Sequence, residues 1–335
     1  MEESNHNAPA SRGTYNLFVG NLLSTILLAF SAIIVARLLG PNEYGLYSIA
    51  LILPSYVYLI LRLGFSSTIT RYVAKYASEG KQKKAISFSY SVSIIHLAAG
   101  LFVLGLLIPF SRLISLNLFH RPELVTGILI PIALLSVAGQ IMFDNGSASF
   151  FGLHKFGKSA IIQIIKSVTQ LVLSVTLVVL GYSVLGAVVG YSCGLLISGA
   201  ASLIMIISIN RKLIIENVKE NFLTTIRYSF QVYGSKLLTT LISPLQITLL
   251  TLVVSNTEIG WYGAAQNIAA LITLFTYPVA NVLLPVFSRN TNGDLKTLLE
   301  PYTLSIKYTA LHQFRIEMYS KIGFQVQQVD TLRRL

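Results

Sequence analysis

Three cations and one amide lie within apolar stretches and are the side chains best placed to do chemistry: Arg62, Lys166, Lys236 and Asn21. A Lys or Arg at the centre of a membrane-spanning helix costs about 2.5 to 3.5 kcal/mol even on a lenient scale, so it needs a partner or water. Such a cation can bind an anionic group. The structural alternative is that its charged head reaches the lipid phosphates at the membrane surface.

Residue patterns typical of enzymes are missing from the sequence. It has no glycine-rich lysine loop for phosphates, no cluster with metal-ligand spacing and no nucleophile beside a base. The single cysteine, Cys193, lies in an apolar segment and indicates neither a disulfide nor a metal site. We therefore expect no enzymatic activity and no cofactor.

The composition indicates which elements position these residues. Of the 335 residues, 53% are hydrophobic and 11% are charged, whereas about 25% of a soluble domain is charged. The net charge of +12 sits in short loops rather than on one face, so nucleic acid is not an expected partner. The sequence predicts an all-α, polytopic membrane protein of about eight transmembrane helices.

The segment Ala36–Tyr47 (ARLLGPNEYGLY) separates two apolar runs. The 24 residues before Arg37 and the 18 residues from Tyr44 to Leu61 are uncharged, and a helix rising about 1.5 Å per residue needs about 20 to cross a bilayer. Gly40 and Pro41 then form the tip of a transmembrane hairpin. Asn42 and Glu43 are expected to satisfy the free N–H groups of the second helix.

Further apolar runs predict the remaining helices. We expect spans at 85–111, 124–143, about 159–180, about 184–208, about 229–254 and about 259–287. A basic amphipathic loop separates the second and third spans. A turn-rich loop follows the fourth span, with Asp144 in a turn formed with Asn145 and Gly146. His96 is expected to be a packed polar residue rather than a proton relay.

An internal repeat links the hairpin tip to a later segment. One constant offset, that from Glu43 to Glu258, places NEYGLYSIA on TEIGWYGAA without a gap. This spacing predicts a six-helix unit whose second copy begins near residue 228. The motif positions are Arg37, Gly40, Glu43, Gly45 and Tyr47 in the first copy and Glu258, Gly260 and Tyr262 in the second.

The distribution of Lys and Arg predicts the orientation. Most loop cations fall on one side, and only Arg37, Arg112 and Arg121 fall on the other. By the positive-inside rule, the N-terminus is cytoplasmic and the repeated tips are outside. We therefore expect a multi-pass protein of the cell membrane.

The sequence divides into five expected parts. They are a disordered cytoplasmic N-terminus (1–13), a first six-helix lobe (14–210), a cytoplasmic inter-lobe loop (211–227), a partial second lobe (228–310) and a polar tail (311–335). The tail is too charged to span a membrane. It indicates either a natural fragment or a shifted reading frame, the second being preferred.

ARLLGPNEYGLY followed by LGFSSTITRYVAKY, and EIGWYGAAQNIA followed by LLPVFSR, resemble the two lobes of oligosaccharide flippases. These belong to the multidrug/oligosaccharidyl-lipid/polysaccharide (MOP) exporter superfamily, and the resemblance covers residues 14 to about 308. It implies two pseudo-symmetric bundles of twelve to fourteen helices in all, around a cavity that opens alternately to either side. This sequence ends four or more helices short of that number. Arg62 stands where an LDLG-type acidic residue is frequent in the family.

The resemblance implies a lipid-linked glycan as substrate, with an isoprenoid diphosphate that must cross the bilayer. Arg62 and Lys236 are then the best candidates to bind it, because helices one, two, seven and eight pair across the symmetry axis, and Lys166 and Asn21 are weaker ones. Membrane lipid and functionally coupled glycosyltransferases are the expected partners. A drug/cation antiporter of the same superfamily, for which Asp144 is the available acid, and a membrane-embedded glycosyltransferase remain the alternatives.

Overall fold

The computed structural model describes residues 8–62, 64–117, 128–209, 237 and 240–269. Within these ranges the chain is helical and contains no strand. The predicted all-α class is therefore confirmed. The expected boundaries of the five parts of the chain remain predictions.

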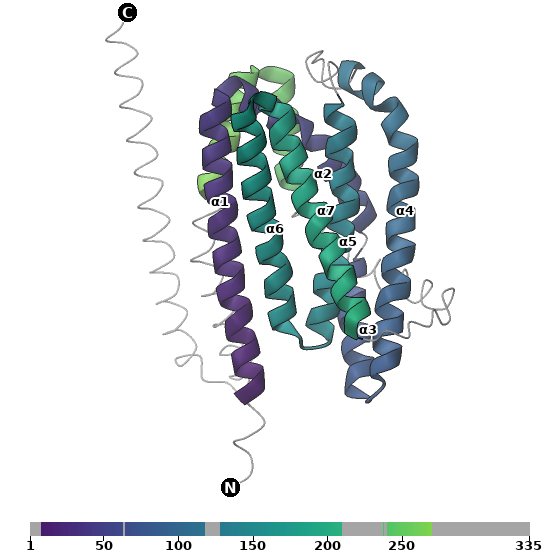
Figure 1. The fold of residues 1–335 in the computed structure, drawn as a ribbon. Helices are drawn as coiled ribbons and strands as arrows, with labels where there is room; N and C mark the ends of the chain where they lie inside the picture. Colours follow the sequence, from purple (N-terminus) through teal and green to yellow (C-terminus); the bar gives the residue numbers. More distant parts are fainter. Residues whose placement is uncertain (1–7, 63, 118–127, 210–236, 238–239, 270–335) are drawn as a thin grey trace, which may run out of the picture. The chain divides into compact units, whose positions relative to one another are not determined.

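The first hairpin forms where the sequence places it. Helix α1 (Ala8–Ala50) is interrupted at Gly40, whose φ of 72° and ψ of 171° are not helical. Glycine adopts this backbone without a Cβ clash, and Pro41 then opens the next helical segment. Helices α2 (Ile52–Arg62) and α3 (Phe65–Ser78) follow. Figure 1 shows α1 running from one end of the bundle to the other and α3 back at the end where α1 begins.

The next helices form a second set of long passes. They are α4 (Gln82–Asn117), α5 (Leu129–Gly152), α6 (Phe156–Leu177) and α7 (Ser183–Ile209), with the π-helical turn η2 (Val178–Tyr182) between the last two. Gly181 lies in that turn with a φ of 91°. The hairpin predicted near Gly181 is confirmed.

Four segments of the described chain are long and apolar enough to cross a membrane: Tyr15–Ser78, Gln82–Ser111, Leu129–Gly152 and Phe156–Ile209. The first contains the turn at Gly40 and the last contains the turn at Gly181, so each of these two makes two passes. Such helices satisfy their own backbone groups, as the hydrocarbon core requires. The chain is a multi-pass membrane protein.

The helices pack in a fixed order that small residues permit. Helix α1 packs on α6, α6 on α7, α7 on α5, and α5 on α4 and α3. A Cβ on Gly139 of α5 would lie 2.6 Å from the carbonyl carbon of Leu195 in α7, and a Cβ on Gly199 would lie 2.7 Å from the carbonyl oxygen of Gly139. The backbones of α5 and α7 are thus in direct contact, as is common where helices associate in membranes.

The turn predicted after the fourth span does not exist. Helix α5 continues through Asp144, Asn145 and Gly146 to Gly152, and Asn145 is fully buried. The polar residues are tolerated because each has a partner: Asp144 accepts hydrogen bonds from Tyr58 and Gln140, and Asn145 pairs with His96. Asn145-Gly146-Ser147 also matches the acceptor pattern for N-glycosylation, and Asn145 lies fully buried inside the bundle.

The segment expected as a basic loop after the second span is largely helical. Helix α3 buries Phe65, Ile69 and Val73 on one face and exposes Arg71 and Lys75 on the other. The apolar stripe packs against α4 and α5, and the basic side faces outward.

The second copy of the hairpin tip begins with a capping box. The helix Thr240–Val253 is followed by Ser255, whose hydroxyl accepts from the N–H of Glu258 at 3.4 Å and whose own N–H donates to the Glu258 carboxylate at 2.8 Å. This reciprocal pair starts the helix over 256–269. In the first copy Glu43 does not cap its own helix as predicted, since its carboxylate accepts a hydrogen bond from Ser183 at 2.5 Å.

The two copies of the tip contact each other reciprocally. A Cβ on Gly45 would overlap the carbonyl group of Asn256, and a Cβ on Gly260 would overlap the carbonyl group of Pro41. The repeat offset relates Pro41 to Asn256 and Gly45 to Gly260, so each contact is the counterpart of the other. The sequence offset is thus matched by a two-fold relation in space, which supports the predicted repeat.

Candidate functional site: a cavity beside Arg62

A cavity of about 260 Å³ lies where α2, α3 and α5 meet. Its polar lining comes from Arg62 at the end of α2, from three hydroxyl residues of α3, and from Asp144 and Ser147 of α5. Thr240, at the start of the helix Thr240–Val253, also lines it. The cavity therefore lies between the first copy of the repeat and the first described helix of the second.

Arg62 is placed there by the end of its helix. It is the last residue of α2, and its guanidinium carbon lies 5.8 Å from the centre of the Tyr58 ring, one turn earlier. Gly64 follows in the left-handed region, with φ 78°, and ends the helical run before α3. The predicted site residue thus lines the cavity. The described residues contain no acidic group in an ion pair with it.

Asp144 supplies a carboxylate to the same cavity. It accepts hydrogen bonds from the Tyr58 hydroxyl and, at 3.1 Å, from the Gln140 amide. Tyr58 therefore contacts both the cation and the acid. The sequence interpretation missed Asp144 as a site residue because it placed it in a turn. The residues after Phe143 read DNGSASFFG and are mostly polar or small, so the sequence held no clear signal that the helix continues.

The hydroxyl lining of the cavity was also missed. Ser66, Ser67 and Thr70 project from the first turns of α3. The Thr70 hydroxyl donates to the carbonyl groups of Ser66 and Ala148, at 3.0 and 3.2 Å. A hydroxyl such as that of Ser66, beside a guanidinium, suits an oxyanion such as a phosphate. The sequence contains them in SSTITR directly after Arg62, which was the available signal.

The remaining predicted site residues lie elsewhere. Lys166, in α6, has its ammonium 4.8 Å from the centre of the Phe143 ring and interacts electrostatically with Asp144, but it does not line the cavity. Asn21, in α1, has a buried side-chain oxygen without a hydrogen-bond partner and is also outside the cavity. Lys236 lies outside the described residues.

The hairpin-motif residues gather at the tip contact. Arg37, Gly40 and Gly260 line a second cavity, of about 320 Å³ and mainly apolar. Tyr47 lies with its ring centre 5.5 Å from that of Tyr44, and Tyr262 donates a hydrogen bond to Gln246 at 3.0 Å. These residues shape the packing of the tips and take no part in the Arg62 cavity.

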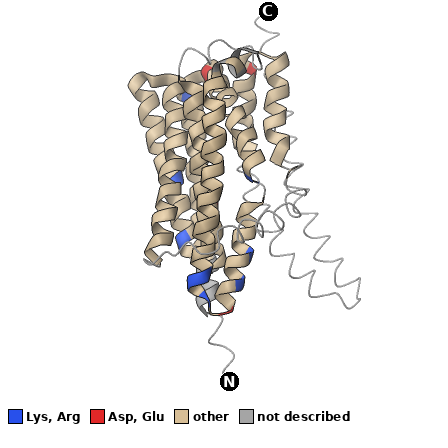
Figure 2. Cartoon of the chain, turned by 90° about the vertical axis from the view of Figure 1, so that its right-hand side faces the viewer, with Lys and Arg blue, Asp and Glu red and all other residues tan. Residues whose placement is uncertain are grey.

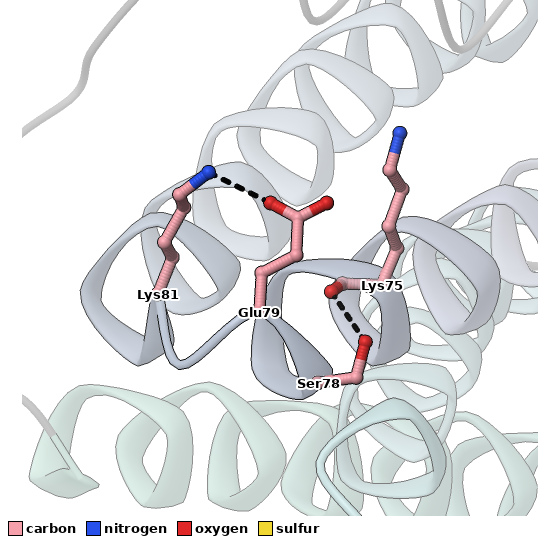
Figure 3. A network of polar contacts seen from close by, with 4 residues as sticks. All are labelled: Lys75, Ser78, Glu79 and Lys81. Carbon is pink, nitrogen blue, oxygen red and sulfur yellow. Dashed lines mark hydrogen bonds and ion pairs between the residues drawn. The ribbon is translucent and has the colours of Figure 1, made fainter.

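Basic residues of the described chain are concentrated toward one end of the bundle. Figure 2 shows most Lys and Arg toward the end where α3 and α4 meet. Glu79 also lies at that end, and Arg37 lies at the tips. At the α3–α4 turn, Lys81 donates to Glu79 at 2.8 Å and Ser78 donates to the carbonyl of Lys75 at 2.8 Å (Figure 3). The hydrogen bond from Lys81 lowers the pKa of Glu79, and the same contact raises the pKa of Lys81.

The fold is similar to that of solved structures, two of which are transporters. The chain matches an inward-facing multidrug resistance MATE family transporter of the MOP superfamily, with a TM-score of 0.63, 14% identity, and coverage of 90% of this chain and 68% of the other. It also matches a MOP superfamily transporter from Pyrococcus furiosus, whose description notes a binding pocket of reverse polarity, with a TM-score of 0.54, 13% identity, and coverage of 92% and 71%. At such identities the likeness shows the fold.

A protein-family model matches most of the sequence. No curated protein sequence matches the chain. The model of the polysaccharide biosynthesis protein family matches residues 10–291, which include the described helices of both copies of the repeat except the first two residues of α1. The chain therefore belongs to the polysaccharide biosynthesis protein family, as a multi-pass membrane protein with the fold of MOP-superfamily transporters.

Proposed function

We propose that the protein is a flippase that moves an isoprenoid-diphosphate-linked oligosaccharide from the cytoplasmic to the outer leaflet of the cell membrane. The observation that carries this proposal is the cavity beside Arg62, where a guanidinium and several hydroxyls line a space between the two copies of the repeat. A diphosphate in the bilayer needs such donors, because an unpaired charge there costs several kcal/mol. The family, whose description is polysaccharide biosynthesis, supplies the substrate class.

The proposed transport requires alternating access and no covalent chemistry. Arg62 and the Ser66 hydroxyl bind the diphosphate, and the cavity then opens to the other side when the two copies of the repeat move apart at their tips. The close backbone contact of Gly45 and Gly260 corresponds to closure on the tip side. We place the N-terminus in the cytoplasm because basic residues gather at the end where α1 begins. Glycosyltransferases supply the substrate.

The experiment uses the full chain in liposomes with a fluorescent polyprenyl-diphosphate disaccharide. Its transfer between leaflets is followed by the loss of fluorescence to a membrane-impermeant reductant. Arg62→Ala should slow transfer by about tenfold or more, because a hydrogen bond to a charged group contributes about 1.5 to 3 kcal/mol. Lys83→Ala removes an exposed cation outside the cavity and serves as the control. Equal rates for the wild type and Arg62→Ala would remove Arg62 from the mechanism.

A second candidate function is cation-coupled export of a drug. The observation that favours it is the position of Asp144, a carboxylate inside a membrane-spanning helix. Intramembrane acids often carry coupling ions or protons. Liposomes holding the protein should then expel a cationic dye when a sodium or proton gradient is imposed, and Asp144→Asn should abolish the effect. Dye movement that is the same with and without a gradient would dismiss this candidate.

A further inference from the structure

The helical run ends immediately after Arg62, and this end is held by a side chain from another helix. The last four carbonyl groups of a helix have no partner within it and need one elsewhere. Near the end of α2, the carbonyl oxygen of Leu61 lies 3.0 Å from Nε2 of His96, which belongs to α4. Because a carbonyl group can only accept, Nε2 must carry the hydrogen. His96 therefore caps the helix one residue before Arg62.

A second residue fixes the orientation of the His96 ring. The side-chain nitrogen of Asn145, in α5, lies 3.1 Å from Nδ1 of His96, and its oxygen lies 3.3 Å from the same atom. With Nε2 as the donor, Nδ1 of a neutral ring accepts the amide N–H of Asn145. His96 is 2% exposed and Asn145 is fully buried, so water does not compete for these bonds.

The ring is also held from its face. Phe65, the first residue of α3, stacks on His96 with ring centres 4.2 Å apart and planes inclined by 16°. His96 thus touches the chain on both sides of the break that follows Arg62, at Leu61 and at Phe65. Asn145 is the neighbour of Asp144, which lines the cavity. Adjacent residues of α5 therefore line the cavity and orient the His96 ring.

We propose that His96, oriented by Asn145, is a positioning residue for Arg62. It holds the end of α2 so that the guanidinium enters the cavity, and it does not itself touch the substrate. The inference rests on the proposed function only in assigning Arg62 to the diphosphate. The placement of residue 62 by His96 is a statement about the protein alone, so it can be tested without any substrate.

The first test measures where residue 62 points. Arg62→Cys is introduced together with Cys193→Ser, which removes the single natural cysteine, and labelling by a charged, water-soluble thiol reagent is timed. His96→Asn keeps an acceptor for the Asn145 amide near the Nδ1 position but is too short to reach Leu61, whereas the amide nitrogen of a Gln side chain takes the place of Nε2. His96→Asn should slow labelling by about tenfold, and His96→Gln should restore the rate. His154→Asn, at the exposed α5–α6 turn, is the matched control.

The second test measures binding of farnesyl diphosphate to the purified full chain with Arg62 present. His96→Asn should weaken binding by about tenfold, and in an Arg62→Ala background it should have no further effect, because a positioning residue acts through the group it positions. A folded His96→Asn protein whose residue 62 is labelled at the unaltered rate would overturn the inference. The inference would also be overturned if His96→Asn weakened farnesyl diphosphate binding equally with and without Arg62. Altered labelling with no diphosphate binding in any variant would leave the positioning role standing and overturn the proposed function.

Discussion

A disulfide should form between the two copies of the repeat if their tips meet as the structure shows. Ser48 and Gly263 are related by the repeat offset and face each other. A Cβ on Gly263 would lie 3.8 Å from the Cβ of Ser48, and the mean separation of these atoms in disulfides is about 3.8 Å. The double variant Ser48→Cys, Gly263→Cys therefore needs no movement of the backbone.

The assay uses this double variant in a Cys193→Ser background, so that no other thiol is present. We expect the disulfide to form during mild oxidation in native membranes. The linked peptides are identified by mass spectrometry after proteolysis, and reduction separates them. As a control, Gly105→Cys replaces Gly263→Cys, because nothing in the described structure lies within 4 Å of a Cβ at Gly105.

The same pair of cysteines reports on the glycine contact beside it. A Cβ on Gly45 would lie 2.7 Å from the carbonyl carbon of Asn256, whereas ordinary contact begins at 3.4 Å, so the helices must separate by about 0.7 Å. The carbonyl oxygen of Asn256 would overlap this Cβ, so about 0.7 Å is the least separation needed. All these atoms belong to the backbone and no side chain can rotate away. Gly45→Ala should therefore slow formation of the disulfide. Failure of the original pair to link, or linking as fast through Gly105→Cys, would refute the arrangement of the tips.

Three further predictions concern packing, the cavity and the surface. Gly139→Ala should lower the melting temperature, with a cost of about 1 to 3 kcal/mol from overpacking against Leu195, whereas Gly105→Ala should not, as thermal unfolding in detergent would show. Asp144→Asn removes a negative charge from the cavity and should tighten binding of farnesyl diphosphate in a calorimetric titration; weaker binding would contradict this. Glu79 is charged, and its contact with Lys81 is present, at a pH above the lowered pKa of Glu79; the contact is lost as the pH falls through that pKa. Both side chains are exposed, so the contact contributes little to stability. Glu79→Gln should therefore leave the melting temperature at pH 7 unchanged.

The long helices and their turns follow from the sequence because the bilayer imposes simple rules. Uncharged runs of about 20 residues are long enough to cross, and Gly with Pro ends them. The turn at Gly40 was predicted for this reason, and that near Gly181 because the uncharged run around it is too long for one helix and contains Gly; both turns are present. The repeat was also visible, since the contact between its copies depends on glycines that recur at one offset.

The candidate site was predicted only in part, for an equally physical reason. Arg62 was found because a cation is conspicuous in an apolar run. Asp144 and Asn145 were assigned to a turn, because a sequence alone does not show that Tyr58, Gln140 and His96 will satisfy them inside a helix bundle. Local preference for turns is weak against such long-range hydrogen bonds. The partners of a polar residue, rather than its type, decide whether a helix continues through it.

The two copies of the repeat correspond in their residues at the tips but not in the cavity. Where backbone meets backbone the residues correspond, as Gly45 does with Gly260. The cavity residue Arg62 has no such counterpart. The same offset relates Arg62 to Tyr277, which carries no charge. A steric requirement at the tips applies equally to both copies, since each helix must approach the other. A charge requirement does not, because one guanidinium is enough to bind one diphosphate and a second in the same apolar surroundings would add its own desolvation cost. The matching glycines at the tips therefore serve the motion that we propose, and the unmatched Arg62 serves the binding of the diphosphate.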